Sequence, residues 1–461
     1  MLKHKRLSLA VAGALALAGA STANAGIGFK AGEWDIDFSG NVNGFATYND
    51  CASTGTQIVG GVVTPRPAVA GGLACAEVGN TKNSSTSIES GLLPSALVFS
   101  AKSRQANMDV GVTIGLYPTL RTFGLGDSNN GSLGNSSINV RQNFLTFGDA
   151  SWGTVKVGRD IGIFGSDAIL SDMTLLGVGS GAAFLGGNTT LGRIGVGYIY
   201  TDWIPQISYT SPSFAGFQFA GGMFQTFNTY DAILGVDRNA AGLSAANTPG
   251  WQAKVSFEDK FNIVEGDPLG FKAWAGYMYN SPESAGTTGT FNGAFIPSGL
   301  SADGNAWEIG ARANMWGFEL VGYYYDADGI GTTAIGSQAV SYVCAAVTGC
   351  PNGVGGSLES RKSDGYYGQI TYKFQDLKVG YSYGQSNLKL AGNEGTTAVA
   401  GSFNAANPDL LRSNSSNVVG VYYSLTKSLN LVGEWIRTES KSQGGNSYND
   451  NGFALGAILF F

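Results

Sequence analysis

The chain has 461 residues, of which 43% are hydrophobic and only 13% carry a charge, against roughly 25% charged residues in ordinary soluble proteins. It holds 27 basic side chains, 33 acidic side chains and a single histidine, His4. The acidic balance argues against nucleic acid as a partner. With its only histidine in the first few residues, the chain is a poor candidate for a Ser-His-Asp triad or a histidine-dependent zinc site.

The first 25 residues have the pattern of a secretory signal peptide. A basic start at residues 3–6 precedes an apolar run at 7–20, and a small-x-small cleavage site, Ala-Asn-Ala, ends at residue 25. The apolar run is shorter than the ~20 residues that span a bilayer as a helix. Loss of this segment leaves 24 basic and 33 acidic side chains, a net charge of −9, in a mature region at 26–461.

Sixteen segments after the signal are predicted as strands, and several alternate apolar and polar residues with a period of two. In 250–260, for example, Trp251 and Val255 share one face, and Lys254 lies on the other. No later stretch has 18 uninterrupted apolar residues, so a membrane location requires a closed barrel. The predicted strands are about 35–48, 95–103, 106–117, 136–147, 152–160, 203–211, 216–228, 250–260, 270–280, 305–315, 316–326, 362–374, 376–387, 413–425, 428–440 and 450–461.

The connections between these strands alternate between long and short. Eight long loops and seven turns are typical of an even-stranded barrel with long external loops and short periplasmic turns. Both ends of the barrel then lie on the periplasmic side. Because a closed barrel has no edge strand, Pro94 and Pro205 are expected at a strand start or at a bulge.

The four cysteines form two close pairs, Cys51 with Cys75 and Cys344 with Cys350. Each pair falls in one predicted external loop, and export permits disulfides. We therefore predict a Cys51–Cys75 and a Cys344–Cys350 disulfide, with four free thiols as the alternative.

The last strand places apolar residues at 453, 455, 457, 459 and 461 and stops on Phe461. This ending resembles the closing strand of bacterial outer-membrane barrels. In that family the final Phe is part of the signal read by the barrel-assembly machinery, which the resemblance implies as a partner here.

Two further segments resemble the Gram-negative trimeric porins, the general diffusion pores. One is Arg-Gln-Asn-Phe-Leu at 141–145 followed by Trp-Gly-Thr-Val-Lys-Val-Gly-Arg at 152–159, and the other is the turn Tyr-Thr-Ser-Pro-Ser-Phe-Ala-Gly-Phe at 209–217. The resemblance implies an all-β, 16-stranded antiparallel transmembrane β-barrel in the outer membrane, assembled as a homotrimer. It also implies that the third external loop, 161–202, folds into the pore and narrows it.

The same resemblance implies a set of charged residues at the narrowest point. Arg159 matches the wall arginine that precedes the loop, and Asp172 matches the acid of the family's Thr-Asp-Met. Asp167 is a further loop carboxylate. Arg141 and Arg193 lie nearby in the sequence, with their facing left open. Together these five residues are the predicted pore constriction.

The chain also departs from the family pattern. After Met173 it continues Thr-Leu-Leu-Gly-Val-Gly, where the family often has Leu-Pro-Glu-Phe-Gly-Gly, so a glutamate is missing. Asp202 and Trp203 stand where many members place an arginine. We therefore expect a less charged, more apolar constriction, and the ion preference stays open.

The leading functional hypothesis is a passive outer-membrane channel for small hydrophilic solutes and ions, embedded in outer-membrane lipid. The alternatives are a channel selective for one small solute, an outer-membrane enzyme, and a barrel that serves as adhesin or anchor. The missing histidine argues against the enzyme, and the length of loop 161–202 argues against the anchor. No cofactor or metal site is predicted, because the Asp-Ala-Asp-Gly at 326–329 lacks the other ligands of a calcium loop.

Overall fold

A computed structural model describes most of the chain after residue 25, and the predicted signal peptide lies outside the described residues. The described ranges are 26–51, 56–59, 62–65, 69–76, 84–118, 120, 138–183, 189–226, 243–245, 247–264, 266–284, 290–291, 294–295, 300–344, 356–392, 394 and 408–461.

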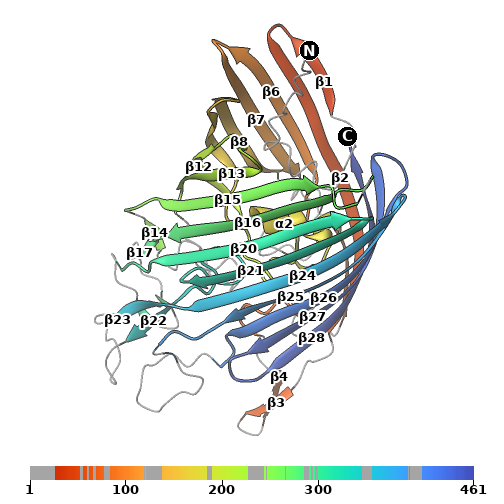
Figure 1. The fold of residues 1–461 in the computed structure, drawn as a ribbon. Helices are drawn as coiled ribbons and strands as arrows, with labels where there is room; N and C mark the ends of the chain where they lie inside the picture. The colour runs from red at the N-terminus through yellow and green to blue at the C-terminus, as the bar shows by residue number, and fades with distance from the viewer. Residues whose placement is uncertain are drawn as a thin grey trace.

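In this part of the chain sixteen strands form a closed antiparallel barrel (Figure 1). Each strand pairs with the next along the chain, and the last pairs with the first, which closes the wall. All sixteen predicted strands are confirmed, and most of their ends lie within about two residues of the expected positions. The wall strands are β2 (Trp34–Cys51), β6 (Ala96–Gln105), β7 (Met108–Pro118), β8 (Ile138–Asp149), β9 (Gly153–Ile161), β12 (Trp203–Thr210), β13 (Phe217–Phe224), β15 (Gly250–Phe261), β16 (Leu269–Asn280), β20 (Gly304–Met315), β21 (Phe318–Asp328), β24 (Lys362–Phe374), β25 (Leu377–Leu388), β26 (Leu411–Ser424), β27 (Leu429–Ser442) and β28 (Ser447–Phe460).

Two shorter strands, β1 (Ile27–Ala31) and β5 (Ser84–Glu89), extend the same sheet along β2. Pro94 lies just before β6, in the break between β5 and β6, as expected. Pro205 was expected at a strand start or a bulge but is the third residue of β12, where it pairs in unbroken register with Arg159. Paired short strands decorate the loops: β3 (Thr56–Val59) with β4 (Val62–Pro65), β14 (Leu243–Ala245) with β17 (Glu283–Ser284), β18 (Thr290–Phe291) with β19 (Ala294–Phe295), and β22 (Val340–Cys344) with β23 (Gly356–Ser360).

The two-residue period sorts the side chains onto two faces of the wall. On β28 the large apolar residues Phe453, Leu455 and Leu459 are exposed on the outer face, and Ala454 and Ile458 are buried on the inner face. The same sorting recurs around the barrel, so the outer surface is an apolar band suited to lipid. No helix among the described residues is long and apolar enough to be a candidate membrane span.

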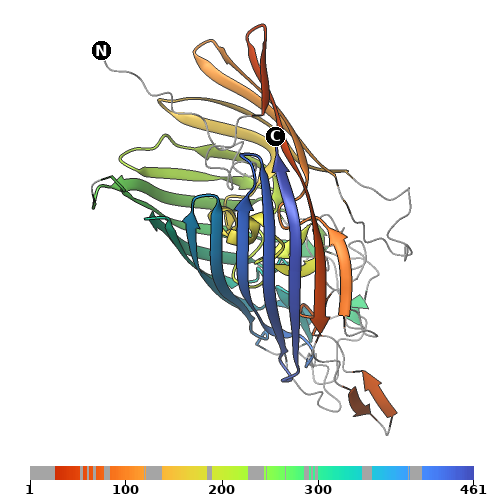
Figure 2. The same ribbon diagram turned by 90° about the vertical axis from the view of Figure 1, so that its right-hand side faces the viewer.

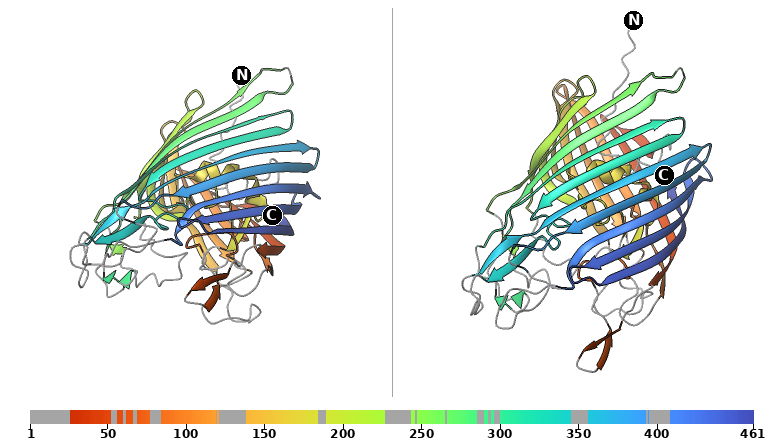
Figure 3. Two further views of the ribbon diagram at one scale, coloured as in Figure 1. Left: turned by 90° about the horizontal axis from the view of Figure 1, so that it is seen from below. Right: turned by 60° about the horizontal axis from the view of Figure 1, so that its bottom comes forward.

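The barrel has two distinct ends (Figure 3). β1 and the end of β28 lie at the end with the short turns, and the β3–β4 and β22–β23 hairpins lie at the other. The backbone of Phe461 exchanges two hydrogen bonds with Gly40, of 2.9 and 3.1 Å, and so continues the seam between β28 and β2.

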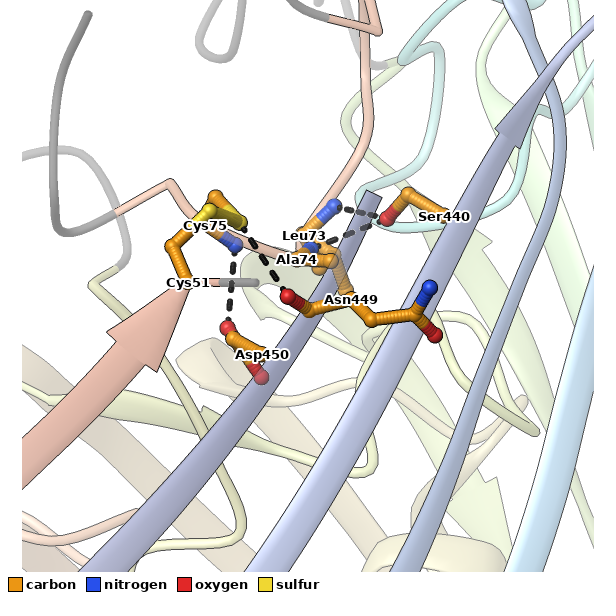
Figure 4. Close-up of a disulfide and its surroundings, with 7 residues drawn as sticks. All are labelled: Cys51, Leu73, Ala74, Cys75, Ser440, Asn449 and Asp450. Carbon is orange, nitrogen blue, oxygen red and sulfur yellow. Dashed lines mark hydrogen bonds between the residues drawn. A yellow bond between two sulfur atoms is a disulfide. The ribbon is translucent and has the colours of Figure 1, made fainter. Parts of the chain in front are cut away.

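One predicted disulfide is present at the end opposite the chain termini (Figure 4). Cys51, the last residue of β2, is bonded to Cys75 with their Cα atoms 5.4 Å apart. The Cys75 backbone N–H donates to Asp450 at 2.9 Å, and the N–H of Leu73 donates to Ser440 at 2.9 Å. The disulfide ties residues 69–76 to β2, and these hydrogen bonds hold the same residues against β27 and β28. Cys350 lies outside the described residues, so its pairing with Cys344 stays a prediction.

Candidate channel constriction

The segment after β9 turns into the barrel instead of continuing outward. It contains α2 (Ser166–Ser171), a 3₁₀ turn η1 (Met173–Leu176), β10 (Ser180–Ala183) and β11 (Thr190–Gly192). Figure 2 shows this segment surrounded by the wall strands. Nearly all of its described residues are buried, although most of them are far in sequence from the strands that cover them.

Two buried wall carboxylates hold the loop backbone. Glu308 on β20 is 1% exposed and accepts a 3.0 Å hydrogen bond from the N–H of Gly165. Glu434 on β27 is 4% exposed and accepts from the N–H groups of Val178 and Gly179 at 2.8 and 2.9 Å. A buried backbone N–H left without an acceptor costs stability, so these two residues fix the loop on two separated parts of the wall.

Two wall glutamines add neutral contacts between those points. Gln252 on β15 accepts from the N–H groups of Ile163 and Phe164 at 2.7 and 3.0 Å. Gln369 on β24 accepts from the N–H of Met173 at 2.7 Å. Residues 161–202 thus satisfy several buried backbone donors with wall side chains rather than with water, as buried polar groups require.

Asp167 on α2 meets two basic side chains of the wall. Its two carboxylate oxygens lie 2.5 Å from the ammonium nitrogens of Lys254 on β15 and Lys272 on β16. Burial by itself raises the pKa of Asp167, but the two ammonium groups outweigh burial and hold that pKa below its usual range. The predicted loop carboxylate is therefore ionised and its charge is matched locally.

Asp172 forms hydrogen bonds within the loop, and Arg193 forms a hydrogen bond with the wall. Asp172 caps η1 by accepting from the N–H of Thr174 at 2.9 Å, and it also accepts from the Tyr198 hydroxyl at 2.9 Å. Burial and this nearby carboxylate raise the pKa of Tyr198 above its usual value. Arg193 is fully buried and donates to the carbonyl of Ser416 at 3.2 Å.

The two predicted wall arginines lie apart from these loop acids. Arg159 pairs in register with Asn143 and Pro205, is exposed, and lies on the opposite face of β9 from the buried Asp160. The structure therefore does not bring Arg159 to Asp167 or Asp172. Arg141 stands at a bulge of β8, is 6% exposed, and places its guanidinium carbon 5.4 Å from the ring centre of Tyr117.

The apolar loop residues were expected to line the constriction, but they are buried against the wall. Leu175 and Leu176 are 4% and 7% exposed and belong to the main apolar cluster, which includes wall residues such as Tyr422. The ring centres of Trp203 and Tyr117 are 5.6 Å apart. These side chains pack inside the protein and do not line an aqueous opening.

Sequence reasoning missed the wall residues that hold the loop, namely Glu308, Glu434, Gln252, Gln369, Lys254 and Lys272. A usable signal exists, because all six occupy the polar face of an alternating strand. Their partners lie 87 to 256 residues away in sequence, so the alternation marks them as inward-facing without saying what they contact.

Comparison with known proteins places the chain in a family. The Gram-negative porin family matches residues 9–443, and a search of curated protein sequences finds no significant match. The fold is similar to the outer membrane channel DcaP of Acinetobacter baumannii, with a TM-score of 0.59, 16% identity and coverage of 95% of this chain and 100% of that one.

Two other solved structures share the fold. An anion-selective porin from Comamonas acidovorans matches with a TM-score of 0.55 and 14% identity, covering 93% of this chain and all of the other. Salmonella typhi OmpF in complex with daunomycin matches with a TM-score of 0.52 and 14% identity, covering 94% and 100%. The chain belongs to the Gram-negative porin family and is a diffusion channel of the bacterial outer membrane.

Proposed function

We propose that residues 161–202 form the constriction of this channel and set the size limit for small hydrophilic solutes and ions. A sixteen-stranded barrel is too wide for its wall side chains to fill, so its lumen holds water unless a loop enters it. The observation that carries the proposal is the pair of carboxylates, Glu308 and Glu434, that hold the same loop from β20 and β27. A loop fastened at separated points of the wall crosses part of the lumen.

Deleting residues 166–183, which removes α2, η1 and β10, tests this function. The wall strands pair with one another and not with the deleted segment, so we expect a folded barrel with a different migration in heated and unheated gel samples. Single-channel conductance should rise, and liposomes that contain the variant should admit larger sugars. A folded variant with the parent's conductance and size limit would refute the proposal.

We also propose that the channel is a homotrimer. The outer face carries a groove of about 1080 Å³ over β2, β5 and β26–β28, lined by large apolar side chains such as Ile88, Leu120 and Leu455. A second copy would cover this groove, whereas lipid would cover the rest of the apolar band. The substitution Leu120→Gln should weaken the oligomer on unheated gels, while Ile309→Gln, at an exposed position on β20, serves as its control. Equal oligomer stability in both variants would count against this interface.

The alternative of a channel selective for one specific small solute, recognised by a more apolar constriction, finds little support, because Leu175 and Leu176 are packed against the wall. We further propose that the chain has no enzymatic activity. The mature region contains no histidine, and every buried acid at the loop has a stated role in holding it.

A further inference from the structure

The inner face of one wall sector carries pairs of like charges. Lys272 on β16 and Arg312 on β20 are directly opposed in the register, and so are Lys373 on β24 and Lys378 on β25. The alternate positions on β20 and β25 hold the exposed apolar residues, so all four basic side chains face the lumen. Like charges directly opposite each other in a sheet cost stability, which calls for a compensating role.

Most of these charges are only partly matched by acids. Lys272 shares Asp167 with Lys254 at the loop, whereas the nearest ion-pair contact of Arg312 is Glu319 at 4.0 Å. Among the described residues, Lys373 and Lys378 contact no acid within ion-pair distance. The Lys378 ammonium lies 4.8 Å from the ring centre of Tyr422.

The exposure of these side chains increases away from the loop. Lys254 is 16% exposed, Lys272 is 22% exposed and Arg312 is 33% exposed, and Lys373 is exposed next to a short turn. This basic strip, defined as Lys254, Lys272, Arg312, Lys373 and Lys378, therefore extends from the loop toward the end of the barrel with the short turns. It stands out in a mature chain whose net charge is −9.

We propose that the basic strip binds small oxyanions, such as carboxylates and phosphate, and makes the channel prefer anions. An anion that moves along the wall meets a cation at each step and relieves the repulsion between paired cations. Because Arg312 and Lys373 keep much of their surface in water, contacts at the open end of the strip are weak enough to be released, as conduction requires. The proposal rests on the channel function, since only an open water path past the loop brings solutes to the strip.

The test uses the purified protein in a planar bilayer under a tenfold potassium chloride gradient. The sign of the reversal potential should indicate anion preference, and added inorganic phosphate should reduce the chloride current with saturation. A unit charge about 4–6 Å away in a water-like medium changes the local ion concentration roughly three- to fivefold. Each charge raises the anion and lowers the cation concentration, so the double variant Lys373→Gln, Lys378→Gln should lower the anion-to-cation permeability ratio by at least that factor and weaken the phosphate block.

Matched controls are Lys389→Gln at the rim, 68% exposed, and Lys427→Gln in the turn between β26 and β27. Both should keep the parent's ratio, because charges farther than a Debye length of ~8 Å are screened. A cation-selective parent, or a double variant indistinguishable from the controls, would overturn the proposal while leaving the channel function intact. Complete lack of conductance in the folded parent would overturn both.

Discussion

Glu434 offers the sharpest test of how the constriction is held in place. Its carboxylate accepts from the N–H groups of Val178 and Gly179 and from the Tyr422 hydroxyl, at 2.7 to 2.9 Å. In Glu434→Ala the two buried backbone donors lose their acceptor. Each buried donor left unsatisfied costs about 1–3 kcal/mol, so the docked loop loses at least about 2 kcal/mol. That corresponds to a shift of roughly 30-fold toward the undocked loop.

The assay is single-channel recording combined with limited proteolysis of the loop. Glu434→Ala should show noisier open states and faster cleavage within 161–202, and Glu434→Gln, which keeps an acceptor oxygen, should lie between it and the parent. Glu439→Ala is the control, since Glu439 is on the same strand but is held at the rim by Lys441 at 3.2 Å. If Glu434→Ala matches Glu439→Ala in noise and cleavage, Glu434 does not hold the loop.

Three more predictions concern the closing strand β28, residues 69–76 and the outer loops. Removing Phe461 should lower the yield of folded barrel in outer-membrane extracts, because the chain loses the end of its closing strand; unchanged yield would argue against a role in assembly. Replacing Cys51 and Cys75 by serine should raise hydrogen exchange in residues 69–76 without changing heat-modifiable migration, and exchange equal to the parent's would contradict this. Burial raises the pKa of Glu394, but its hydrogen bonds with Arg361, the shortest 2.5 Å, outweigh burial and lower that pKa. A lowered folded-state pKa gives stability that is present at neutral pH and lost as the pH falls through that value. Exchange in residues 388–392 should therefore rise at acidic pH in the parent but not in Glu394→Gln.

The barrel was predictable because the features that define it, the alternation within each strand and the lengths of the connections, are visible in short stretches of sequence. Alternation along 250–260 reports which residues face lipid, and the lengths of the connections report which end of the barrel they occupy. The limit of this reasoning is β5, which lies between the predicted strands 35–48 and 95–103 where only a loop was expected, and Pro94 lies in the break between β5 and β6. Only the pairing of both β5 and β6 with β2 reveals the extra strand.

The constriction was less predictable because its contacts are not local. A motif placed Arg159 at the wall, but the facing of a strand residue depends on register, and register places it beside Asn143 on the outer face. Asp167 and Lys254 are 87 residues apart in sequence. No pattern in either segment predicts that these two side chains form an ion pair. Sequence supplied the charged candidates, whereas three-dimensional pairing decides which of them are neutralised.

That pairing separates the roles of the loop and the wall. Asp167 is matched by two ammonium groups, and Asp172 is held by three hydrogen bonds from neutral donors, so both carboxylates are fixed by contacts within the loop and the wall. Lys373 is exposed and has no such partner among the described residues, so it acts on the lumen as a full charge over about a Debye length of ~8 Å. Substitutions in the loop should therefore change the width and steadiness of the channel, and substitutions in the basic strip should change which ions it prefers.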